Sequence, residues 1–329
     1  MSKTKIIAVG ELSREEWLTI RRKYIGGSDA AAVVGLSPYQ SQYSLWADKK
    51  GMLPPKEETE AMKVGTELEN YVAIRFMEKS GKKVRRSLYM WGNSQYPWAS
   101  ANIDREVIGE RAFMEAKTAS VLNLKKFQGG NFPTQYYAQC VHYLAVTEFD
   151  RAYLAVLILG KAFLIYQLTR VPNDVVPDWC EDSVFVSDDE IKALMREEHD
   201  FWRDYVETDS PPPLDGAEGT TGALEAIYEG GGGEVELFGR EKLIEQYQYL
   251  AERKKAIDKD MDTIKQQLMA DLGDNERGYC GRYTVDWRSQ TKQTFDAKTF
   301  RRDHPEMELN GYFKTSNFRR FTIKEEATA

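Results

Sequence analysis

Two strand-like runs carry the strongest signal in this chain: Tyr96-Pro97-Trp98-Ala99-Ser100-Ala101-Asn102-Ile103-Asp104 and Ala112-Phe113-Met114-Glu115-Ala116-Lys117. Successive side chains on a strand point to opposite faces, so Glu115 and Lys117 share one face while Met114 and Ala116 share the other. Residues 107–111, between the runs, are typical of a hairpin turn. A hairpin would bring Asp104 beside Glu115 and Lys117, which predicts two carboxylates and an ammonium group in one patch.

This combination of side chains suits metal-dependent phosphodiester chemistry. Carboxylate oxygens are the ligands that Mg²⁺ and Mn²⁺ prefer. A neighbouring lysine can hold a water molecule and stabilise charge on a phosphate. The alternative is a surface ion pair between Glu115 and Lys117, worth a few tenths of a kcal/mol, roughly. Spacing by itself does not separate the two interpretations.

A third carboxylate comes from residues 59–80, which we predict to be one helix. Leu68, Val72 and Phe76 form its apolar stripe, and Glu69 lies at the edge of that stripe. A carboxylate there is costly unless it is paired or binds a metal. Gly65, one turn earlier, suggests that a backbone or ligand approaches closely. The alternative is that Glu69 reaches solvent.

A second predicted helix covers residues 135–143. Gln135, Gln139 and Tyr143 stand four residues apart on one face. Neutral amides and a phenol can position a phosphate or orient a lysine without adding charge. An ordinary polar helix face remains the alternative.

The run Arg21-Arg22-Lys23-Tyr24-Ile25-Gly26-Gly27-Ser28 predicts an anion site near the N-terminus. Ser28 occupies a predicted helix N-cap, and helix N-termini attract phosphate groups. The three basic residues that precede it add positive charge. Simple capping by Ser28 is compatible with this function.

In their order along the chain, these motifs resemble the PD-(D/E)XK nucleases of the RecB-like branch, and within them the YqaJ-like viral recombinases related to lambda exonuclease. The resemblance covers residues 12 to about 170. It implies an α/β, restriction-endonuclease-like core in which helices flank a central mixed β-sheet. The matching positions are Arg21, Ile25-Gly26-Gly27-Ser28, Gly65, Glu69, Asn102-Ile103-Asp104, Glu115-Ala116-Lys117 and Gln139-Cys140-Val141-His142-Tyr143.

The resemblance also implies roles for individual residues. Asp104, Glu115 and the main-chain carbonyl of Ala116 would hold one Mg²⁺, and Glu69 with Asp104 would hold a second; Mn²⁺ can substitute. Lys117 would orient the attacking water, and Gln139 would support the site from its helix.

DNA contacts are implied in the same way. Arg21 and Ser28 match residues that hold the 5′-phosphate in relatives, and we place Tyr143 with them as a DNA contact. A basic residue found in some relatives six positions after the catalytic lysine is replaced by Asn123, with Lys125 and Lys126 as candidates to take its place.

Composition excludes several other classes. The 329 residues are 42% hydrophobic and 29% charged, as in globular proteins. No apolar run reaches transmembrane length, no signal peptide begins the chain, and the three cysteines form no zinc or disulfide pattern. We therefore expect a cytoplasmic protein that does not contact membranes, and the resemblance implies a phage or prophage origin in a bacterial host.

We predict three segments. Residues 1–175 form the nuclease core and end with strands at 151–159 and 162–169. Residues 176–233 form a helical extension, with a helix at 188–207, and a Pro/Gly-rich linker. Residues 234–329 form an α+β extension for partner binding or oligomerisation. Its elements are one long helix at 238–272, whose apolar stripe is interrupted around Lys254, and strand-like pieces at 279–288 and 312–324.

The predicted function is Mg²⁺-dependent exonuclease digestion of linear double-stranded DNA, 5′ to 3′, in phage-type recombination. An endonuclease or flap nuclease with the same metal site is one alternative, and a noncatalytic adaptor that binds DNA ends is another. The resemblance further implies a ring-shaped homotrimer and a single-strand annealing protein as partner.

Overall fold

A six-stranded mixed β-sheet forms the centre of the N-terminal part of the chain. The strand order is β10-β9-β8-β7-β6-β3, in which β7 runs parallel to β8 and β9 parallel to β10, while the other neighbours are antiparallel. The predicted strands at 151–159 and 162–169 are confirmed as β8 and β9. The strands are β3 (Val84–Arg86), β6 (Arg105–Val107), β7 (Ala112–Ala119), β8 (Arg151–Ile158), β9 (Ala162–Thr169) and β10 (Asp182–Phe185).

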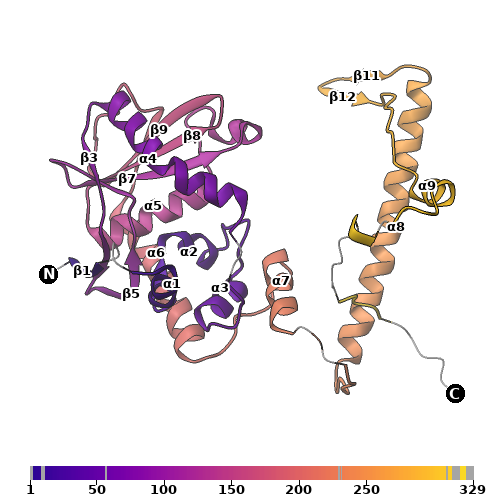
Figure 1. Ribbon diagram of the computed structural model, residues 1–329, viewed down its shortest axis with the longest axis horizontal. Coiled ribbons are helices and arrows are strands. Elements are labelled where there is room, and N and C mark those ends of the chain that lie inside the picture. The colour runs from indigo at the N-terminus through magenta and orange to yellow at the C-terminus, as the bar shows by residue number, and fades with distance from the viewer. Residues whose placement is uncertain are drawn as a thin grey trace. The chain divides into compact units, whose positions relative to one another are not determined.

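The computed structural model describes residues 3–8, 12–55, 58–228, 230, 232–308, 310–312 and 319–323. The chain divides into two compact units, residues 1–229 and 230–329 (Figure 1). Residues 176–229, which we expected to form a separate extension and linker, therefore belong to the first unit: β10 pairs with β9, and helix α6 (Asp188–Phe201) joins the core.

Two helices cover the sheet, one on each face. Helix α4 (Glu60–Ser80) packs Val72 and Phe76 against Met114 of β7, whereas helix α5 (Thr134–Thr147) packs Leu144 against Phe113. Each of these side chains is fully buried, which contributes roughly 1.5–3 kcal/mol apiece. The predicted alternation along β7 and the predicted α/β fold class, with helices flanking a mixed sheet, are confirmed.

Helix α4 matches its predicted range because both ends are capped. The Thr59 hydroxyl accepts the N–H of Met62 at 3.3 Å, and Gly81, at φ 71°, follows the last turn. Gly residues adopt this left-handed conformation without the steric cost that other residues meet.

The predicted hairpin is wrong in one of its strands. Residues Tyr96–Ala101 form β5, which belongs to a separate four-stranded sheet with β1 (Lys3–Ala8), β2 (Ile25–Gly26) and β4 (Tyr89–Asn93). The antiparallel partner of β7 is β6, with Arg105 opposite Met114. Asp104 lies in the short link where the chain crosses from one sheet to the other.

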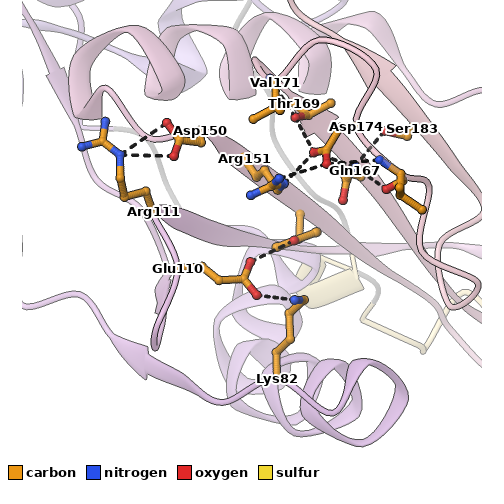
Figure 2. A network of polar contacts seen from close by, with 12 residues as sticks. Lys82, Glu110, Arg111, Asp150, Arg151, Gln167, Thr169, Val171, Asp174 and Ser183 are labelled. Atoms are coloured by element: carbon orange, nitrogen blue, oxygen red, sulfur yellow. Dashed lines mark hydrogen bonds and ion pairs between the residues drawn. The ribbon is translucent and has the colours of Figure 1, made fainter.

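A polar network fixes the loop that leads from β9 to β10 (Figure 2). Asp174 accepts two hydrogen bonds from Arg151, at 2.6 and 2.9 Å, and one from Thr169 at 2.7 Å. Nearby, Glu110 pairs with Lys82 and accepts a hydrogen bond from the Tyr153 hydroxyl at 3.1 Å. These contacts anchor the sheet at the end opposite the carboxyl end of β7.

The N-terminal helices pack against α5 and carry a second core. Helix α2 (Gly27–Val33) begins after Gly26, so Ser28 lies inside its first turn and does not cap it, contrary to our prediction. The Asp29 carboxylate accepts the N–H of Gly26 instead, at 3.0 Å. The remaining helices of this unit are α1 (Arg14–Arg21), α3 (Gln42–Lys49), a 3₁₀ helix (Val121–Phe127), α6, a π-helix (Trp202–Glu207) and α7 (Glu218–Ile227).

The second unit is dominated by helix α8 (Glu241–Leu272), which Figure 1 shows as one continuous helix. The predicted single long helix at 238–272 is confirmed, and it begins at Glu241. The predicted piece at 279–288 is the hairpin β11 (Arg277–Cys280) and β12 (Tyr283–Asp286), followed by α9 (Ala297–Asp303) and a 3₁₀ turn (Asn310–Tyr312). Of the predicted strand at 312–324, residues 319–323 are not in a strand, and residues 313–318 and 324 lie outside the described residues.

Gly27 is required by close packing, and this yields a stability prediction. A Cβ at Gly27 would lie 2.3 Å from Cε1 of Tyr143, a buried ring. We expect Gly27→Ala to lower the free energy of unfolding by about 1–3 kcal/mol, the usual cost of overpacking. Urea denaturation measures this change.

Gly222, inside α7, supplies the matched control, because a Cβ added there would meet no atom of a neighbouring element within 4 Å. We expect Gly222→Ala to raise stability by up to about 1 kcal/mol. Equal stability of Gly27→Ala and the unmodified protein would contradict the packing argument.

Candidate active site

Asp104, Glu115 and Lys117 converge at the carboxyl end of β7. The Asp104 carboxylate accepts the N–H of Ala116 at 2.8 Å, and the Lys117 ammonium lies 2.7 Å from Oε1 of Glu115. Together they line a cleft of about 440 Å³. The other residues that line it are Met62, Gly65, Thr66, Glu69, Val72, Ala116 and Thr118.

The main-chain carbonyl of Ala116 points to the same side of β7 as Asp104. Strand β6 pairs with β7 only as far as Met114, so the edge beyond is open. The N–H and C=O of one strand residue point in the same direction. Since Asp104 binds the N–H of Ala116, the carbonyl of Ala116 also faces the Asp104 side.

Gln139 of α5 holds the catalytic candidate Glu115 in place, as predicted. Its side-chain nitrogen donates to Oε1 of Glu115 at 2.6 Å and lies 3.3 Å from the Tyr143 hydroxyl. Tyr143 is only 5% exposed, and its ring packs against α2. This burial argues against the predicted DNA contact for Tyr143. The Tyr143 hydroxyl instead accepts a hydrogen bond from Gln139.

Glu69 is paired, through a residue that the sequence analysis missed. Its carboxylate forms an ion pair with Arg105, whose side chain is 8% exposed against 29% for Glu69. Arg105 also donates to the main-chain oxygen of Asp104, at 2.9 Å. The only signal in the sequence was the position of Arg105 directly after Asp104.

Gly65 does not face a close protein neighbour. A Cβ at this position would lie 3.6 Å from Oγ1 of Thr118, an ordinary contact distance. Both residues line the cleft, so a side chain at Gly65 would reduce the space there. Tyr136, which the sequence analysis also missed, places its ring centroid 5.4 Å from the Lys117 ammonium.

Burial and the negative charge of neighbouring carboxylates raise the pKa values of Asp104 and Glu115. Burial raises the pKa of Asp104 well above its usual 3.8, and the charges of Glu115 and Glu69 raise it further. Burial likewise raises the pKa of Glu115, which Lys117 partly opposes. Such shifts are common where carboxylates serve a chemical role.

Lys117 remains a cation at neutral pH. Burial would lower its pKa, but Glu115 and Asp104 outweigh this effect and raise the pKa above the usual lysine value. A protonated amine cannot accept a proton from water. It can orient a water molecule through its N–H groups and stabilise negative charge.

The donor atoms fit one divalent cation better than two. Oε2 of Glu115 is buried and has no hydrogen-bond partner among the described residues. A cation beside this oxygen, Asp104 and the Ala116 carbonyl would offset the cost of burying two carboxylates. Glu69 is engaged by Arg105, and nowhere in the described part of the chain do three His, Cys, Asp or Glu side chains already form a metal-binding group.

Arg21 and Ser28 also come together, in a second cleft of about 650 Å³. Arg21 donates to the Ser28 hydroxyl at 2.8 Å and pairs with Asp29 at 3.0 Å. Asp29, which is buried, also pairs with Lys49 at 2.5 Å, and neither of these two residues was predicted. One negative and two positive charges leave a net charge of about +1 on this cluster.

The charges of Lys49 and Arg21 keep Asp29 ionised. Burial would raise the pKa of Asp29, but Lys49 and Arg21 outweigh it and hold the pKa far below its usual value. Asp29 therefore stays ionised and fixes the position of Arg21. Lys125 and Lys126, the candidates for the missing basic residue, are exposed.

Two comparisons with known proteins point to one family. Residues 16–150 match the family described as the YqaJ-like viral recombinase domain. The protein YqaJ of Bacillus subtilis (strain 168) is 34% identical over 322 residues, which span 96% of this chain and 95% of that protein. Protein D345L of African swine fever virus (strain Badajoz 1971 Vero-adapted) is 40% identical over 52 residues, 16% of this chain and 15% of that protein.

Among solved structures, the alkaline exonuclease LHK-Exo from Laribacter hongkongensis aligns with a TM-score of 0.46 at 18% identity, over 59% of this chain and 93% of that one.

None of the helices in the described ranges combines the length and apolar character needed to cross a bilayer.

The raised pKa of Asp104 predicts a stability change that does not depend on activity. The folded state binds the Asp104 proton more tightly than the unfolded state, so stability falls as pH rises above the usual pKa of 3.8. Asp104→Asn removes this cost and keeps an oxygen for the Ala116 N–H. We expect a higher Tm than the unmodified protein at pH 8 in EDTA, and a difference that shrinks toward pH 4.

Thermal unfolding measures this effect, at about 2–4 °C per kcal/mol for a domain of this size. Glu67→Gln, on the exposed side of α4, is the control and should leave Tm unchanged. Saturating Mg²⁺ should raise the Tm of the unmodified protein and not that of Asp104→Asn. An Asp104→Asn protein less stable than the unmodified one at pH 8 in EDTA would refute the argument.

Proposed function

Since the chain belongs to the family of YqaJ-like viral recombinases, we propose that it is a Mg²⁺-dependent exonuclease that digests linear double-stranded DNA from 5′ to 3′ in phage-type recombination. The observation that carries this proposal is the buried Glu115 carboxylate. One of its oxygens is fixed by Lys117 and Gln139, and the other has no hydrogen-bond partner among the described residues, in the cleft that Asp104 also lines.

Several side chains and main-chain groups of the protein contribute to phosphodiester hydrolysis, each in a different way. At the site formed by Asp104, Glu115 and the Ala116 carbonyl, a bound Mg²⁺ would supply positive charge for activating water and stabilising negative charge on the phosphate oxygens. Lys117 orients the attacking water and stabilises charge on the phosphate. Gln139 fixes the orientation of Glu115, and the Ala116 N–H fixes that of Asp104.

We propose two cation positions with different requirements. Asp104, Glu115 and the Ala116 carbonyl hold the first, and Mn²⁺ can replace Mg²⁺ there. The second needs Glu69 together with Asp104. Because Arg105 pairs with Glu69, Glu69 has to exchange this partner for a cation, so the second position is the weaker of the two.

The cleft around Arg21 and Ser28 is the proposed site for the 5′-phosphate of the DNA end. Its net positive charge, held in place by Asp29 and Lys49, favours a phosphate. The ring of three subunits, the annealing partner and the cytoplasmic, phage-derived setting stay predictions.

Lys117→Ala is expected to reduce cleavage at least 100-fold and leave the affinity for DNA ends within a few fold, because charge-stabilising groups usually contribute a factor of this size. Single-turnover digestion and a filter-binding assay measure the two quantities. Lys83→Ala, at an exposed lysine, is the control and should keep full activity. Residual cleavage above about one percent would exclude the assigned role.

A digestion assay separates this function from its rivals. We expect linear duplexes to be degraded with Mg²⁺ or Mn²⁺ and untouched in EDTA, and closed circular DNA to stay intact. Ends that carry a 5′-phosphate should be digested faster than 5′-hydroxyl ends, and Arg21→Ala should remove that preference. Cutting of closed circles would indicate an endonuclease, and binding without metal-dependent digestion would indicate a noncatalytic adaptor.

A further inference from the structure

Helix α8 carries a regular stripe along one face. Its members follow one another at alternating steps of four and three residues, the spacing of positions a and d in a heptad repeat. We call these residues the α8 stripe: Leu243, Tyr247, Leu250, Lys254, Ile257, Met261, Ile264 and Leu268. The pattern extends over almost four heptads, the length at which it becomes diagnostic of helix pairing.

The α8 stripe is open to solvent in the described unit. Each of its seven apolar side chains is between 42% and 63% exposed. The opposite face of the helix is polar, with residues such as Glu245, Glu252, Lys255, Lys259 and Asp262. A helix with such a face gains most of its stability from packing that face against something else.

Two short contacts reach the ends of the α8 stripe. The Phe321 ring lies 5.8 Å from that of Tyr247 near the start of the helix. Near its end, Met261, Ile264 and Leu268 line an apolar groove of about 280 Å³ with Val285 and Trp287. As far as the described residues go, these contacts leave the middle of the stripe, at Leu250, Lys254 and Ile257, exposed.

We propose that the α8 stripe is the interface with a second copy of this chain, whose α8 packs against it in antiparallel orientation. This interface does not depend on the nuclease function. In an antiparallel pair, each a position faces a d position of the other helix. The stripe satisfies this over its whole length: Leu243 faces Leu268 of the second copy, Tyr247 faces Ile264, Leu250 faces Met261 and Lys254 faces Ile257.

Lys254 selects the antiparallel orientation. In a parallel pair the two Lys254 ammonium groups would face each other in the apolar seam, which is unfavourable. In the antiparallel pair each Lys254 lies against Ile257 of the second copy and can extend its charged end to water. One polar residue in the seam is a common device for fixing orientation and register.

Charges beside the α8 stripe agree with this arrangement. Arg253 and Asp260 occupy the flanking g positions, which face each other in an antiparallel pair. The two-fold symmetry makes this contact twice. Flanking charges are compatible with a parallel pair as well, so the orientation rests on Lys254.

The second copy would also fill the apolar groove at the end of α8. In the antiparallel register, Leu243 and Tyr247 of the second copy lie opposite Leu268 and Ile264, which line that groove. Trp287, 47% exposed, forms its far side and would be covered. The second copy therefore buries both the stripe and the groove.

The first test changes one central residue in the full-length chain. Ile257→Asp places a charge in the seam, and we expect the dissociation constant of the pair to rise at least about 100-fold. Because Ile257 is 53% exposed within one chain, its replacement should not unfold the helix, which circular dichroism checks. Ala256→Asp, on the opposite exposed face, is the control.

Sedimentation equilibrium reads the result. Pairing of α8 joins two chains, or two of the predicted three-subunit rings, so the unmodified protein and Ala256→Asp should contain an even number of chains, and Ile257→Asp should have half that mass. A mass unaffected by Ile257→Asp, or an unmodified protein that is monomeric, overturns the proposal.

The second test reads the orientation through disulfide cross-links. Leu243→Cys and Leu268→Cys are made separately in a Cys280→Ser background, since Cys280 is exposed. In the antiparallel pair, two copies of Cys at the same position are separated by roughly 37 Å, at 1.5 Å per residue. Cross-linked dimers should therefore form only when the two variants are mixed. Cross-linking of either variant alone, or none in the mixture, overturns the antiparallel arrangement.

Discussion

The active site depends on one buried carboxylate. Glu115 is 3% exposed, and such a group is stable only if its surroundings supply charge and hydrogen bonds. Lys117 comes from the same strand, two residues on, and Gln139 comes from the helix that covers that face of the sheet. The register of β7 and the placement of α5 are therefore constrained by the need to satisfy Glu115.

Much of this arrangement follows from local periodicity. The period of two in residues 112–117 predicted that Glu115 and Lys117 share a face, and the period of 3.6 predicted α4, α5 and the side of α5 that carries Gln139. These patterns depend only on residues that are close together in the sequence, so the folded structure preserves them. They identified the residues of the cleft, although they gave the wrong partner strand for β7.

Contacts between distant segments could not be predicted in this way. The pairing of Glu69 with Arg105 and of Asp29 with Lys49 joins side chains 36 and 20 positions apart, and no periodic pattern links them. Ser28 is a residue type common at helix N-caps, yet Asp29 accepts the N–H of Gly26, because the buried Lys49 and the half-buried Arg21 keep Asp29 ionised. Lys254 interrupts the apolar stripe of α8, but lysine is a good helix former, so the single helix that the sequence predicted continues through it.

The contact between Gly27 of α2 and Tyr143 of α5 links two clefts, the one around Arg21 and Ser28 and the one around Glu115. The ring leaves no room for a side chain at position 27, and its hydroxyl lies beside Gln139, which holds Glu115. Position 27 can therefore gain a side chain without cost only if the residue at position 143 becomes smaller. A homologue that makes this exchange would lack the phenol that accepts a hydrogen bond from Gln139.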